Sequence, residues 1–231
     1  MIVTTGNTWE SIRYRIIDPI LFGQDDDYKA EEYWRARFSR FGTGLRGVGY
    51  ATKSEETNLL MYKRAVGTLS DFIKKEGINL SDSKILDVGC GQGFYAKFFS
   101  DAGIKDYTGL DITDILFGQL IQKYPGYRFI KGDVSARYIE GEFDLILMID
   151  VTQHIVNDEK FVFAMRNVES HLRKGGHIIV TSYLAKEPRK ISFSNKARTM
   201  DDYKNIFGKG FQFGEPVPFR DKYIFSIKRL G

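Results

Sequence analysis

The sequence contains little cysteine, proline or histidine: one cysteine, five prolines and three histidines among 231 residues. A single cysteine cannot form an internal disulfide, which excludes a disulfide-stapled scaffold and fits a cytoplasmic protein. No window approaches about 18 consecutive apolar residues, so the sequence predicts no helical membrane span. Residues 1–6 lack a basic segment followed by an apolar one, and we therefore expect no secretion signal.

The chain also lacks a strong excess of charge of either sign. It carries 34 Lys and Arg against 30 Asp and Glu, a formal net charge of +4, and 42% of its residues are hydrophobic. This composition is typical of one ordinary globular domain with a single large core. A dedicated nucleic-acid binder usually has a clustered basic stripe, so nucleic acid is not an expected partner. The densest basic stretch, residues 186–198, is either a solvated surface loop or a recognition segment for an anionic substrate.

The most informative stretch is residues 84–95, Lys-Ile-Leu-Asp-Val-Gly-Cys-Gly-Gln-Gly-Phe-Tyr. Its apolar part predicts a short buried strand, and a helix is expected from Phe94. The three glycines between them, Gly89, Gly91 and Gly93, allow a sharp turn and leave no Cβ to keep a ligand away. The free N–H groups and positive dipole end of the helix point at the same turn. The stretch thus predicts a nucleotide-type cradle at the carboxyl end of the first strand of an α/β unit.

Two kinds of nucleotide fit this cradle. Residues 91–96 match the loose G-x-G-x-x-G/A dinucleotide fingerprint. Asp87 argues against a dinucleotide, because a carboxylate at the end of the strand would repel a pyrophosphate. The same carboxylate suits a ligand that carries a cationic amine.

The residues Asp87-Val88-Gly89-Cys90-Gly91-Gln92-Gly93 resemble the first motif of the class I S-adenosylmethionine (SAM)-dependent methyltransferases. In that family an E/D-x-G-x-G-x-G turn holds the amino-acid end of the cofactor. The resemblance implies SAM as the cofactor, S-adenosyl-L-homocysteine (SAH) as the product, and cofactor contacts at Asp87, Gly89, Cys90, Gly91 and Gly93. Cys90 is interpreted as a small filler of the turn and not as a nucleophile.

Further acids follow at the ends of later predicted strands. Asp111 ends a strand at residues 107–112 and lies 18 residues after Gly93, about where an α/β fold places the acid that binds a ribose. Asp133 ends the next strand, residues 128–134, and the resemblance implies that it accepts a hydrogen bond from the adenine amino group. The predicted cofactor site also includes Ile112, Val134, Asp150 and Arg46.

The later elements complete an α/β fold. Strands are predicted at residues 143–150 and 177–181, the second after a basic helix end and a glycine stop at residues 173–176. Residues 214–220 and 222–228 predict two further strands with a tight turn at Asp221, and strands joined so closely must be antiparallel. The resemblance implies a Rossmann-like, mostly parallel sheet of seven strands in the order 3-2-1-4-5-7-6, with the last strand antiparallel.

The chain is predicted to be one domain with two parts. Residues 80–231 form the SAM-binding methyltransferase domain, with an insertion at residues 184–210 that contains a short helix near residues 200–207. Residues 1–79 form an N-terminal helical extension that caps the sheet, including a long amphipathic helix over residues 55–76.

The first 27 residues are harder to interpret. Residues 1–24 carry isoleucines at helical spacing, interrupted by Pro19, and predict a helix or arm packed on the core or on a second subunit. A homodimer therefore stays open. The acidic run at residues 25–27 is interpreted as the start of a helix, and no metal is expected.

Trp34 and Arg37 lead into a glycine-containing loop at residues 42–50. Small-molecule members of the resembled family often carry a similar W-x-x-R segment and a loop that lies across the cofactor as a lid. The alternative is core packing for Trp34 and a disordered linker at residues 42–50. Arg37, Arg46 and Tyr50 are the candidates for contact with the SAM carboxylate or the acceptor. A loop that closes on binding would exclude water from the reaction.

Methyl transfer from a sulfonium is an in-line displacement, so the protein must hold the acceptor atom opposite the leaving sulfur in a dry site. A hydroxyl acceptor usually needs a base. His154 is the candidate base, because it follows the fourth predicted strand and imidazole exchanges a proton near neutral pH. A structural role for His154 is the alternative, and Asp150 is a second candidate base or its partner. The predicted acceptor contacts are Trp34, Arg37, Tyr50, His154 and Tyr183.

The predicted function is transfer of a methyl group from SAM to a small molecule or to a glycan or lipid precursor, at a hydroxyl. Family members that methylate exocyclic amines of nucleic-acid bases, or glutamine, commonly carry N/D-P-P-Y/F after the fourth strand. Residues 150–153 are Asp-Val-Thr-Gln, with no proline, so those activities are not expected. Two alternatives stay open: a protein or RNA methyltransferase that uses residues 186–198, and a non-catalytic SAM-binding partner subunit.

Overall fold

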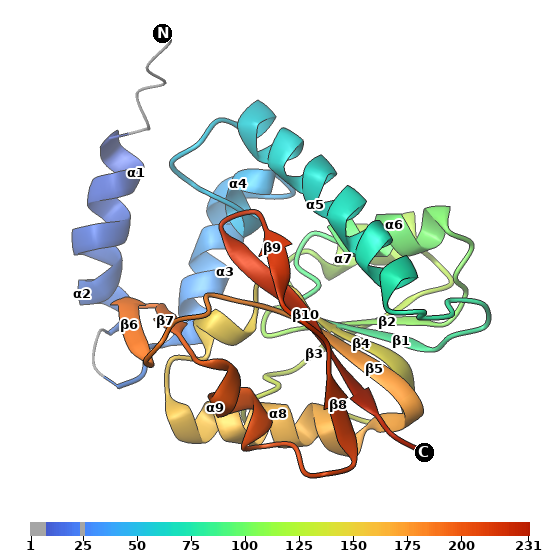
Figure 1. Ribbon diagram of the computed structural model, residues 1–231. Coiled ribbons are helices and arrows are strands. Elements are labelled where there is room, and N and C mark those ends of the chain that lie inside the picture. Colours follow the sequence, from blue (N-terminus) through green and yellow to red (C-terminus); the bar gives the residue numbers. More distant parts are fainter. Residues whose placement is uncertain (1–7, 24–25) are drawn as a thin grey trace, which may run out of the picture.

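The computed structural model describes residues 8–23 and 26–231. Figure 1 shows one twisted sheet with helices on both faces, and a group of N-terminal helices beside it. The predicted arm at residues 1–24 and the acidic run at residues 25–27 lie partly outside the described residues. No helix in the two described ranges is long and apolar enough to cross a membrane.

Five parallel strands form the centre of the sheet in the order β3-β2-β1-β4-β5. β10 (Lys222–Arg229) lies antiparallel against β5, with Ile224 opposite Thr181. The five parallel strands are β1 (Ile85–Val88), β2 (Tyr107–Asp111), β3 (Arg128–Lys131), β4 (Phe143–Met148) and β5 (Leu172–Ser182). β1, β2, β4 and the second half of β5 are buried on both faces because helices cover each side, whereas β3 is largely exposed at the edge of the sheet.

The outer edge of the sheet confirms the predicted order and corrects the number of strands. β10 occupies the place predicted for the seventh strand, next to β5. The predicted sixth strand, residues 214–220, is the shorter β9 (Val217–Phe219), and β8 (Phe211–Phe213) precedes it as a strand that was not predicted; both pair antiparallel with β10. Pro216 lies between them, and a strand breaks where proline has no N–H to give to the ladder. The sheet therefore has eight strands and not seven.

β5 begins earlier than the sequence predicts. A helix end and glycine stop are predicted at residues 173–176, but β5 already begins at Leu172. Its pairing with β4 shifts between Phe143 and Leu145, where the β5 partner changes from Leu172 to His177. Gly175, with a φ of 77°, belongs to the extra residues of this bulge. Gly175 and Gly176 therefore lie in an irregular strand and do not end a helix. Glycine is common at both kinds of position.

Side chains of the central strands alternate between two hydrophobic clusters, one on each face of the sheet. Ile85 and Leu145 belong to the cluster under α5, α6 and α7, whereas Leu86 and Ile146 belong to the cluster under α8 and α9. Figure 1 shows these two groups of helices on opposite sides of the sheet. The helices are α5 (Glu55–Lys75), α6 (Phe94–Asp101), α7 (Phe117–Lys123), α8 (Asp158–Ser170) and α9 (Met200–Lys204).

The N-terminal helices pack against the insertion after β5. Phe22, Tyr33 and Phe193 belong to a small cluster that joins α2 and α3 to the hairpin of β6 (Arg189–Ser192) and β7 (Asn195–Ala197). The basic segment at residues 186–198 is therefore largely a hairpin and not a loop. The N-terminal elements are α1 (Thr8–Ile12), the π-helical turn η1 (Arg13–Ile17), α2 (Asp18–Phe22), α3 (Ala30–Phe41) and α4 (Leu45–Val48).

The isoleucines of α1, η1 and α2 do not pack on the core. Ile12, Ile16 and Ile20 are 42%, 57% and 75% exposed, so the prediction that this face packs on the core is wrong. Packing on a second subunit stays a prediction. The helix continues past Pro19 because the residues before it form the π-helical turn η1, where the ring of Pro19 and its missing N–H are accommodated.

Leu69 of α5 is fully buried between this helix and the sheet. We expect Leu69→Ala to lower the free energy of unfolding by about 2–5 kcal/mol, because it removes buried methyl groups and leaves a cavity. Leu60→Ala, on the exposed side of the same helix (52% exposed), should change it by less than about 0.5 kcal/mol. Urea unfolding followed by circular dichroism measures both variants, and equal losses would contradict the packing described for α5.

Candidate active site

The three glycines after β1 form a turn with no room for side chains. Gly89, Gly91 and Gly93 have φ values of 75°, 52° and 78°, a left-handed conformation that other residues rarely adopt. A Cβ at each position would also lie within 2.8 Å of a neighbouring side chain: Val151 at Gly89, Val48 at Gly91 and Leu120 at Gly93. α6 begins at the next residue, Phe94, so its first N–H groups lie at the turn.

Asp111, at the end of β2, holds this turn from the neighbouring strand. Its Oδ2 accepts the N–H of Gly91 at 2.9 Å, and its Oδ1 accepts the N–H of Thr113 at 3.1 Å. Burial raises the pKa of Asp111 to about 6, although the backbone N–H groups oppose the shift. Asp111 also lines a cavity above the turn. A buried carboxylate in a cavity wall favours a ligand that donates hydrogen bonds, as the two hydroxyls of a ribose do.

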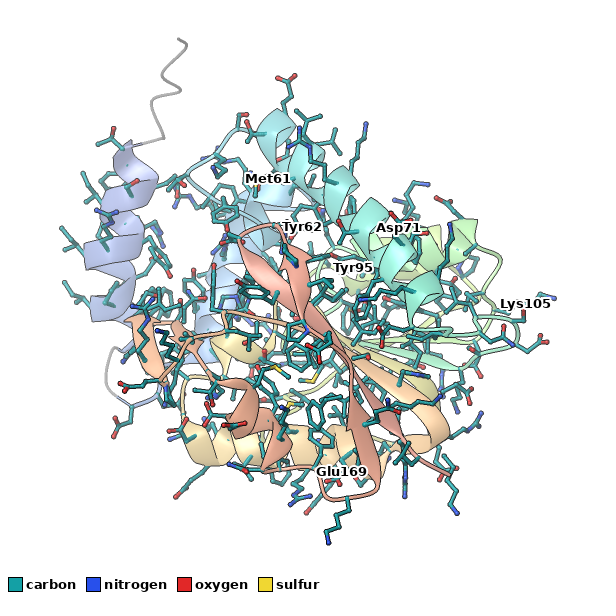
Figure 2. The ribbon with its side chains drawn as sticks, in the orientation of Figure 1. Met61, Tyr62, Asp71, Tyr95, Lys105 and Glu169 are labelled. Atoms are coloured by element: carbon teal, nitrogen blue, oxygen red, sulfur yellow. The ribbon has the colours of Figure 1, made fainter. Side chains whose placement is uncertain are left out.

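This cavity, which we call the cofactor pocket, lies at the carboxyl ends of β1 to β4. Asp133 lines it from the loop after β3, and Ser135 donates to Asp133 Oδ1 from its N–H at 2.8 Å and its hydroxyl at 2.6 Å. The predicted residues Ile112, Val134 and Asp150 line it too. Tyr62 and Tyr95, labelled in Figure 2, belong to its other walls, together with Tyr28, Trp34, Phe38, Val48 and Phe94.

A second cavity of about 520 Å³, the outer cavity, adjoins the cofactor pocket. Trp34, Val48, Asp150 and His154 line both, so the two cavities share a wall. The N-terminal helices α1 to α3 and the β6–β7 hairpin enclose the outer cavity from the other side. Two adjoining cavities with a common wall suit the transfer of a group from a ligand in one to a ligand in the other.

His154 stands in this shared wall with its tautomer fixed. Its Nδ1 lies 2.8 Å from the carbonyl oxygen of Ser194. A carbonyl can only accept, so Nδ1 carries the proton and Nε2 carries the lone pair. Burial lowers the pKa of His154 to about 4, which keeps the imidazole neutral near pH 7. The ring of Trp34 meets it edge-on at 5.0 Å between centroids. The geometry therefore offers a neutral, oriented base.

Asp150 is held by two cations and is not available as a base. Arg220 donates to its Oδ2, and Lys222 Nζ lies 3.0 Å from its Oδ1. Burial alone would raise the pKa of Asp150, but the two cations more than offset it and hold the pKa well below its usual range. Because cations already hold both of its carboxylate oxygens, Asp150 has no free oxygen to accept a hydroxyl proton, which argues against its predicted base role.

Three predicted cofactor contacts, Asp87, Gly93 and Arg46, do not line the cofactor pocket. Asp87 lies in β1 on the face that packs under α6, where the hydroxyl of Tyr107 donates to it at 2.5 Å, and burial raises its pKa to about 7. The prediction overlooked that strand side chains alternate between the two faces. Arg46 donates to the carbonyl of Ala51 at 2.7 Å and lies 3.6 Å from Glu10. It lines neither cavity.

The loop at residues 42–50 lies over the cofactor pocket and is folded. It contains α4, whose first residue, Leu45, donates its N–H to Glu55 at 2.5 Å. Val48 at the end of α4 packs against Gly91 of the glycine turn. α3 and α4 thus lie across the pocket, and Trp34 is a wall of both cavities instead of a residue of the sheet core.

The predicted acceptor contacts Arg37, Tyr50 and Tyr183 line the outer cavity. Arg37 donates to the hydroxyl of Tyr33 at 2.9 Å and to the carbonyl of Gly49. Tyr50 and Tyr183 both donate to the carboxylate of Asp221, in the turn between β9 and β10, Tyr183 at 2.8 Å. These hydrogen bonds tie the lid loop to the C-terminal hairpin.

Sequence analysis missed Arg220 and Lys222, which line the outer cavity and pair with Asp150. They flank Asp221 in a tight turn, a position that is normally solvated. The position of Arg220 and Lys222 in the predicted strand order could have indicated that they lie at the site. The turn before an antiparallel last strand returns to the carboxyl edge of the parallel strands, where ligands bind.

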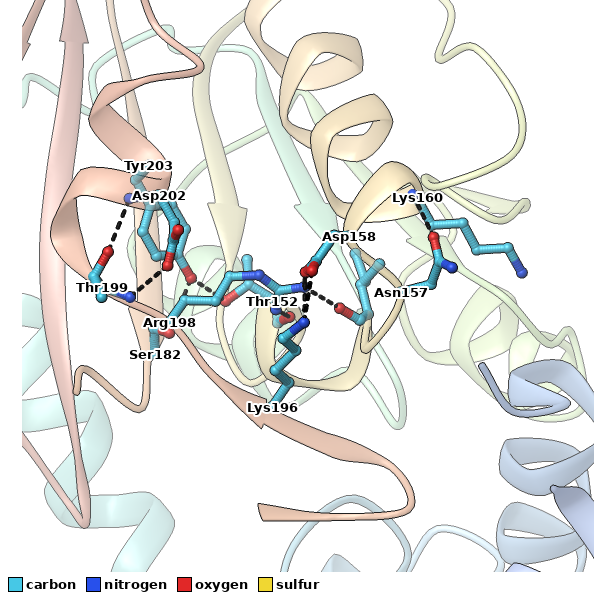
Figure 3. A network of polar contacts seen from close by, with 11 residues as sticks. Thr152, Asn157, Asp158, Lys160, Ser182, Lys196, Arg198, Thr199, Asp202 and Tyr203 are labelled. Carbon is cyan, nitrogen blue, oxygen red and sulfur yellow. Dashed lines mark hydrogen bonds and ion pairs between the residues drawn. The ribbon is translucent and has the colours of Figure 1, made fainter. Parts of the chain in front are cut away.

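The insertion fixes the loop that carries His154 (Figure 3). Arg198, only 1% exposed, donates to the carbonyls of Thr152 at 3.2 Å and Ile155 at 2.7 Å. Its guanidinium also lies 3.7 Å from the ring centroid of Phe161. Tyr203 of α9 donates to the hydroxyl of Thr152 at 2.9 Å. Arg198 is therefore a structural residue and not part of a free basic surface.

The site also decides between the two nucleotide classes. Asp111 suits a ribose in either class, but Asp133 places a second carboxylate in the wall of the pocket, where it would repel a pyrophosphate. The last strand runs antiparallel, whereas a dinucleotide fold would continue with further βα units. The fold and site are those of SAM-binding Rossmann-like proteins. Residues 85–176 match a family described as a methyltransferase domain, and in fold the chain resembles the class I SAM-dependent methyltransferases.

Curated relatives match part of the chain. The phthiotriol/phenolphthiotriol dimycocerosates methyltransferase of Mycobacterium leprae is 32% identical over 105 residues, which are 44% of this chain and 38% of the relative. The ubiquinone biosynthesis O-methyltransferase of Dechloromonas aromatica is 25% identical over 125 residues, 52% of each chain. The chain thus spans about half the length of the curated relatives it matches.

Solved structures share the fold over most of the chain. The magnesium protoporphyrin IX methyltransferase from Synechocystis PCC 6803 with bound SAM superposes with a TM-score of 0.66 at 18% identity, covering 87% of this chain and 95% of that one. The 1,6-didemethyltoxoflavin-N1-methyltransferase from Burkholderia thailandensis gives a TM-score of 0.62 at 16% identity, covering 87% and 90%.

We expect Asp111→Ala to weaken SAM binding by about 1.5–3 kcal/mol, the size of a hydrogen bond to a charged group. Asp101→Ala, which removes an exposed carboxylate from the surface of α6, is the matched control and should leave the affinity unchanged. Isothermal titration calorimetry with SAM measures both. Unchanged affinity in Asp111→Ala would contradict the ribose assignment.

Proposed function

We propose that the chain transfers a methyl group from SAM to a hydroxyl of a small molecule, or of a glycan or lipid precursor, bound in the outer cavity. The observation that carries this proposal is the place of His154 in the wall between the two cavities, with its Nε2 unprotonated. Bound SAM supplies an electrophilic methyl group on its sulfonium. A relative named as an O-methyltransferase is consistent with a hydroxyl acceptor.

The residues of the cofactor pocket fit SAM. In this proposal Asp111 accepts hydrogen bonds from the ribose hydroxyls and Asp133 accepts one from the adenine amino group. Ile112 and Val134 adjoin these two acids and flank the adenosine. The glycine turn lets the cofactor approach the backbone, in space that a Cβ at any of its glycines would fill.

His154 acts as the base. Its Nε2 accepts the hydroxyl proton of the acceptor as the oxygen attacks, while Nδ1–H stays on the carbonyl of Ser194. The edge of Trp34 packs against the imidazole and limits its rotation. Arg37, Tyr50 and Tyr183 supply polar contacts to the acceptor from the walls of the outer cavity.

We further propose that residues 1–79 work as one unit with residues 80–231. α3 and α4 contribute Trp34 and Val48 to both cavities, and α5 contributes Leu69 and Phe72 to the core against the sheet. The insertion at residues 184–210 would then have two roles, because it lines the outer cavity and also fixes the His154 loop.

The acceptor class can be found with SAM labelled on its methyl group. The protein is incubated with labelled SAM and fractionated cell extract, and the label is counted in the metabolite, lipid, glycan, RNA and protein fractions. Label in a small-molecule, lipid or glycan fraction supports the proposal. Label in RNA or protein would replace it by a macromolecular acceptor, and no label despite SAM binding would favour a non-catalytic SAM-binding subunit.

We expect His154→Asn to lower kcat by about 100- to 10,000-fold, the usual contribution of a general base. The asparagine amide can still donate to the carbonyl of Ser194, so the loop should keep its fold and SAM affinity should not change. His171→Asn is the matched control, because His171 also meets a backbone carbonyl through Nδ1, that of Gly141 at 2.6 Å, but lines neither cavity. A kcat near that of the unaltered protein would leave His154 with a structural role.

The pH dependence should follow the low pKa of His154. Because its pKa is lowered to about 4, His154 stays a neutral base as the pH falls from 8 to 5, and its contribution is lost only below that range. A fall in kcat/KM near pH 6.5 that is present in the unaltered protein and absent from His154→Asn would report protonation of His154. We expect no such fall. A loss of that kind would mean that the imidazole has an ordinary pKa.

A further inference from the structure

Three buried polar atoms in the wall of the outer cavity have neither a hydrogen bond nor an ion pair to any of residues 8–23 and 26–231. They are Arg37 Nε, Gln153 Oε1 and Arg220 Nε. Gln153 is 2% exposed, and the side chain of Arg220 is 6% exposed. All three residues line the outer cavity and not the cofactor pocket. Because buried polar groups in native proteins are almost always paired, these atoms point to a ligand of the outer cavity.

Both arginines are held in place through their terminal nitrogens. Arg37 donates to the hydroxyl of Tyr33 at 2.9 Å and to the carbonyl of Gly49. Arg220 donates to Asp150. A guanidinium keeps its charge in a protein, so each Nε–H is a charged donor whose direction is already fixed. Such preorganised donors lose little conformational entropy when they bind an anion.

The lid loop connects the two arginines. Gly49, which accepts from Arg37, is followed by Tyr50, whose hydroxyl donates to Asp221. Asp221 directly follows Arg220 in the turn between β9 and β10, and Figure 1 shows this turn next to α4. Two consecutive residues of the loop therefore link Arg37 to the turn that carries Arg220.

Arg37 also lies near the proposed base. Its guanidinium carbon is 5.3 Å from the ring centroid of Trp34, and the same ring meets the imidazole of His154 at 5.0 Å between centroids. Burial lowers the pKa of His154, and the charge of Arg37 adds to this shift. An acceptor bound at Arg37 can therefore extend past the indole of Trp34 to His154.

No acid of the outer cavity balances the charge of Arg37. The acids that line this cavity each pair with another arginine, and no carboxylate in the described ranges forms an ion pair with Arg37. Arg37 is half-buried, and burial of a charge without a partner is unfavourable. A ligand with negative charge would supply the missing partner. The pairs are Glu10 with Arg40, Asp18 with Arg13, and Asp150 with Arg220.

Aromatic rings contribute to the remaining wall of the outer cavity. Such rings pack against the apolar or cyclic body of a small molecule, and a cavity of about 520 Å³ is large enough to hold one. They belong to Tyr14, Phe22, Tyr33, Trp34, Phe41, Tyr50 and Tyr183.

We propose that the methyl acceptor carries a carboxylate or phosphate group, and that Arg37 and Arg220 bind this group in the outer cavity. Gln153 Oε1 accepts a hydrogen bond from a hydroxyl of the same molecule, and the rest of the acceptor packs on the aromatic rings. This assignment rests on the proposed function and narrows its acceptor to a hydroxy acid or to a phosphate ester that has a hydroxyl. Binding at the anionic end holds the reacting hydroxyl in a fixed position relative to His154.

The affinity of three one-ring probes for the protein saturated with SAH tests this class of acceptor. Benzoate carries a carboxylate, phenyl phosphate carries a phosphate, and benzamide is a neutral molecule of the same shape as benzoate. We expect at least one of the two anions to bind about 10- to 150-fold more tightly than benzamide, the effect of a charge-assisted hydrogen bond. Titration calorimetry measures all three, and the tighter anion identifies the preferred group.

Variants of the arginines separate the anion site from the cofactor site. Arg37→Gln should remove most of the preference for the anion and leave the affinities for benzamide and SAH unchanged, and retained SAH binding shows that the variant is folded. Arg37→Lys keeps the charge and should retain part of the preference. Arg13→Gln is the matched control, because it removes a charge from the same cavity whose guanidinium is already paired with Asp18 at 3.1 Å. If Arg37→Gln does not fold, Arg220→Gln takes its place with the same expected loss.

The product of the reaction gives a second readout. The small molecule that receives label from SAM is passed over an anion-exchange resin, which should retain it. A labelled product that passes through unretained would overturn the anionic class and leave methyl transfer to a small molecule in place. No labelled product despite SAH binding would reject the proposed function, while the probes still decide whether the cavity binds an anion.

Three binding results would overturn the assignment. The first is that neither anion binds more tightly than benzamide. The second is an unchanged preference for the anion in both Arg37→Gln and Arg220→Gln, or an equal loss in Arg13→Gln. The third is a loss of SAH binding in Arg37→Gln while circular dichroism shows a folded protein, which would place Arg37 at the cofactor instead of the acceptor.

Discussion

The constraint on which the site depends is the absence of side chains at Gly89, Gly91 and Gly93. Each glycine is approached by a different part of the fold, by Val151 after β4, by Val48 of α4 and by Leu120 of α7. The turn is therefore a meeting point for three elements and not only a flexible connection. The walls of the cofactor pocket stand where they do because these three side chains can come so close to the backbone.

The two cavities differ in charge. The cofactor pocket has Asp111 and Asp133 in its wall, whereas the outer cavity has six basic residues against three acidic ones. The three acids are already paired with arginines, which leaves the outer cavity with a positive balance. His154 stands between the two, and burial together with the positive charges of Lys222 and Arg37 disfavours its protonation. The same surroundings that keep the base neutral would also attract an acceptor with negative charge.

The sequence predicted those features that depend on local pattern. The glycine turn, the strand-end position of Asp111 and the antiparallel last strand follow from a few neighbouring residues each. Asp87 pairs with Tyr107 and does not line the cofactor pocket, because its direction depends on strand alternation, which a motif does not show. Arg46 and Arg220 depend on partners far away in the chain, Glu10 and Asp150, and no local signal reports such contacts. Long-range pairing thus sets the limit of prediction here.

The order of the strands in space has a consequence for how the protein is made. β10 is synthesised after all of its neighbours in the sheet, yet it lies between them, with β5 on one side and the short strands β8 and β9 on the other. During translation, β8 and β9 emerge first but have no neighbour to pair with until β10 arrives. The turn that carries Arg220 is fixed against Asp150 only at that moment. A nascent chain therefore completes its sheet and one wall of its outer cavity in a single late step.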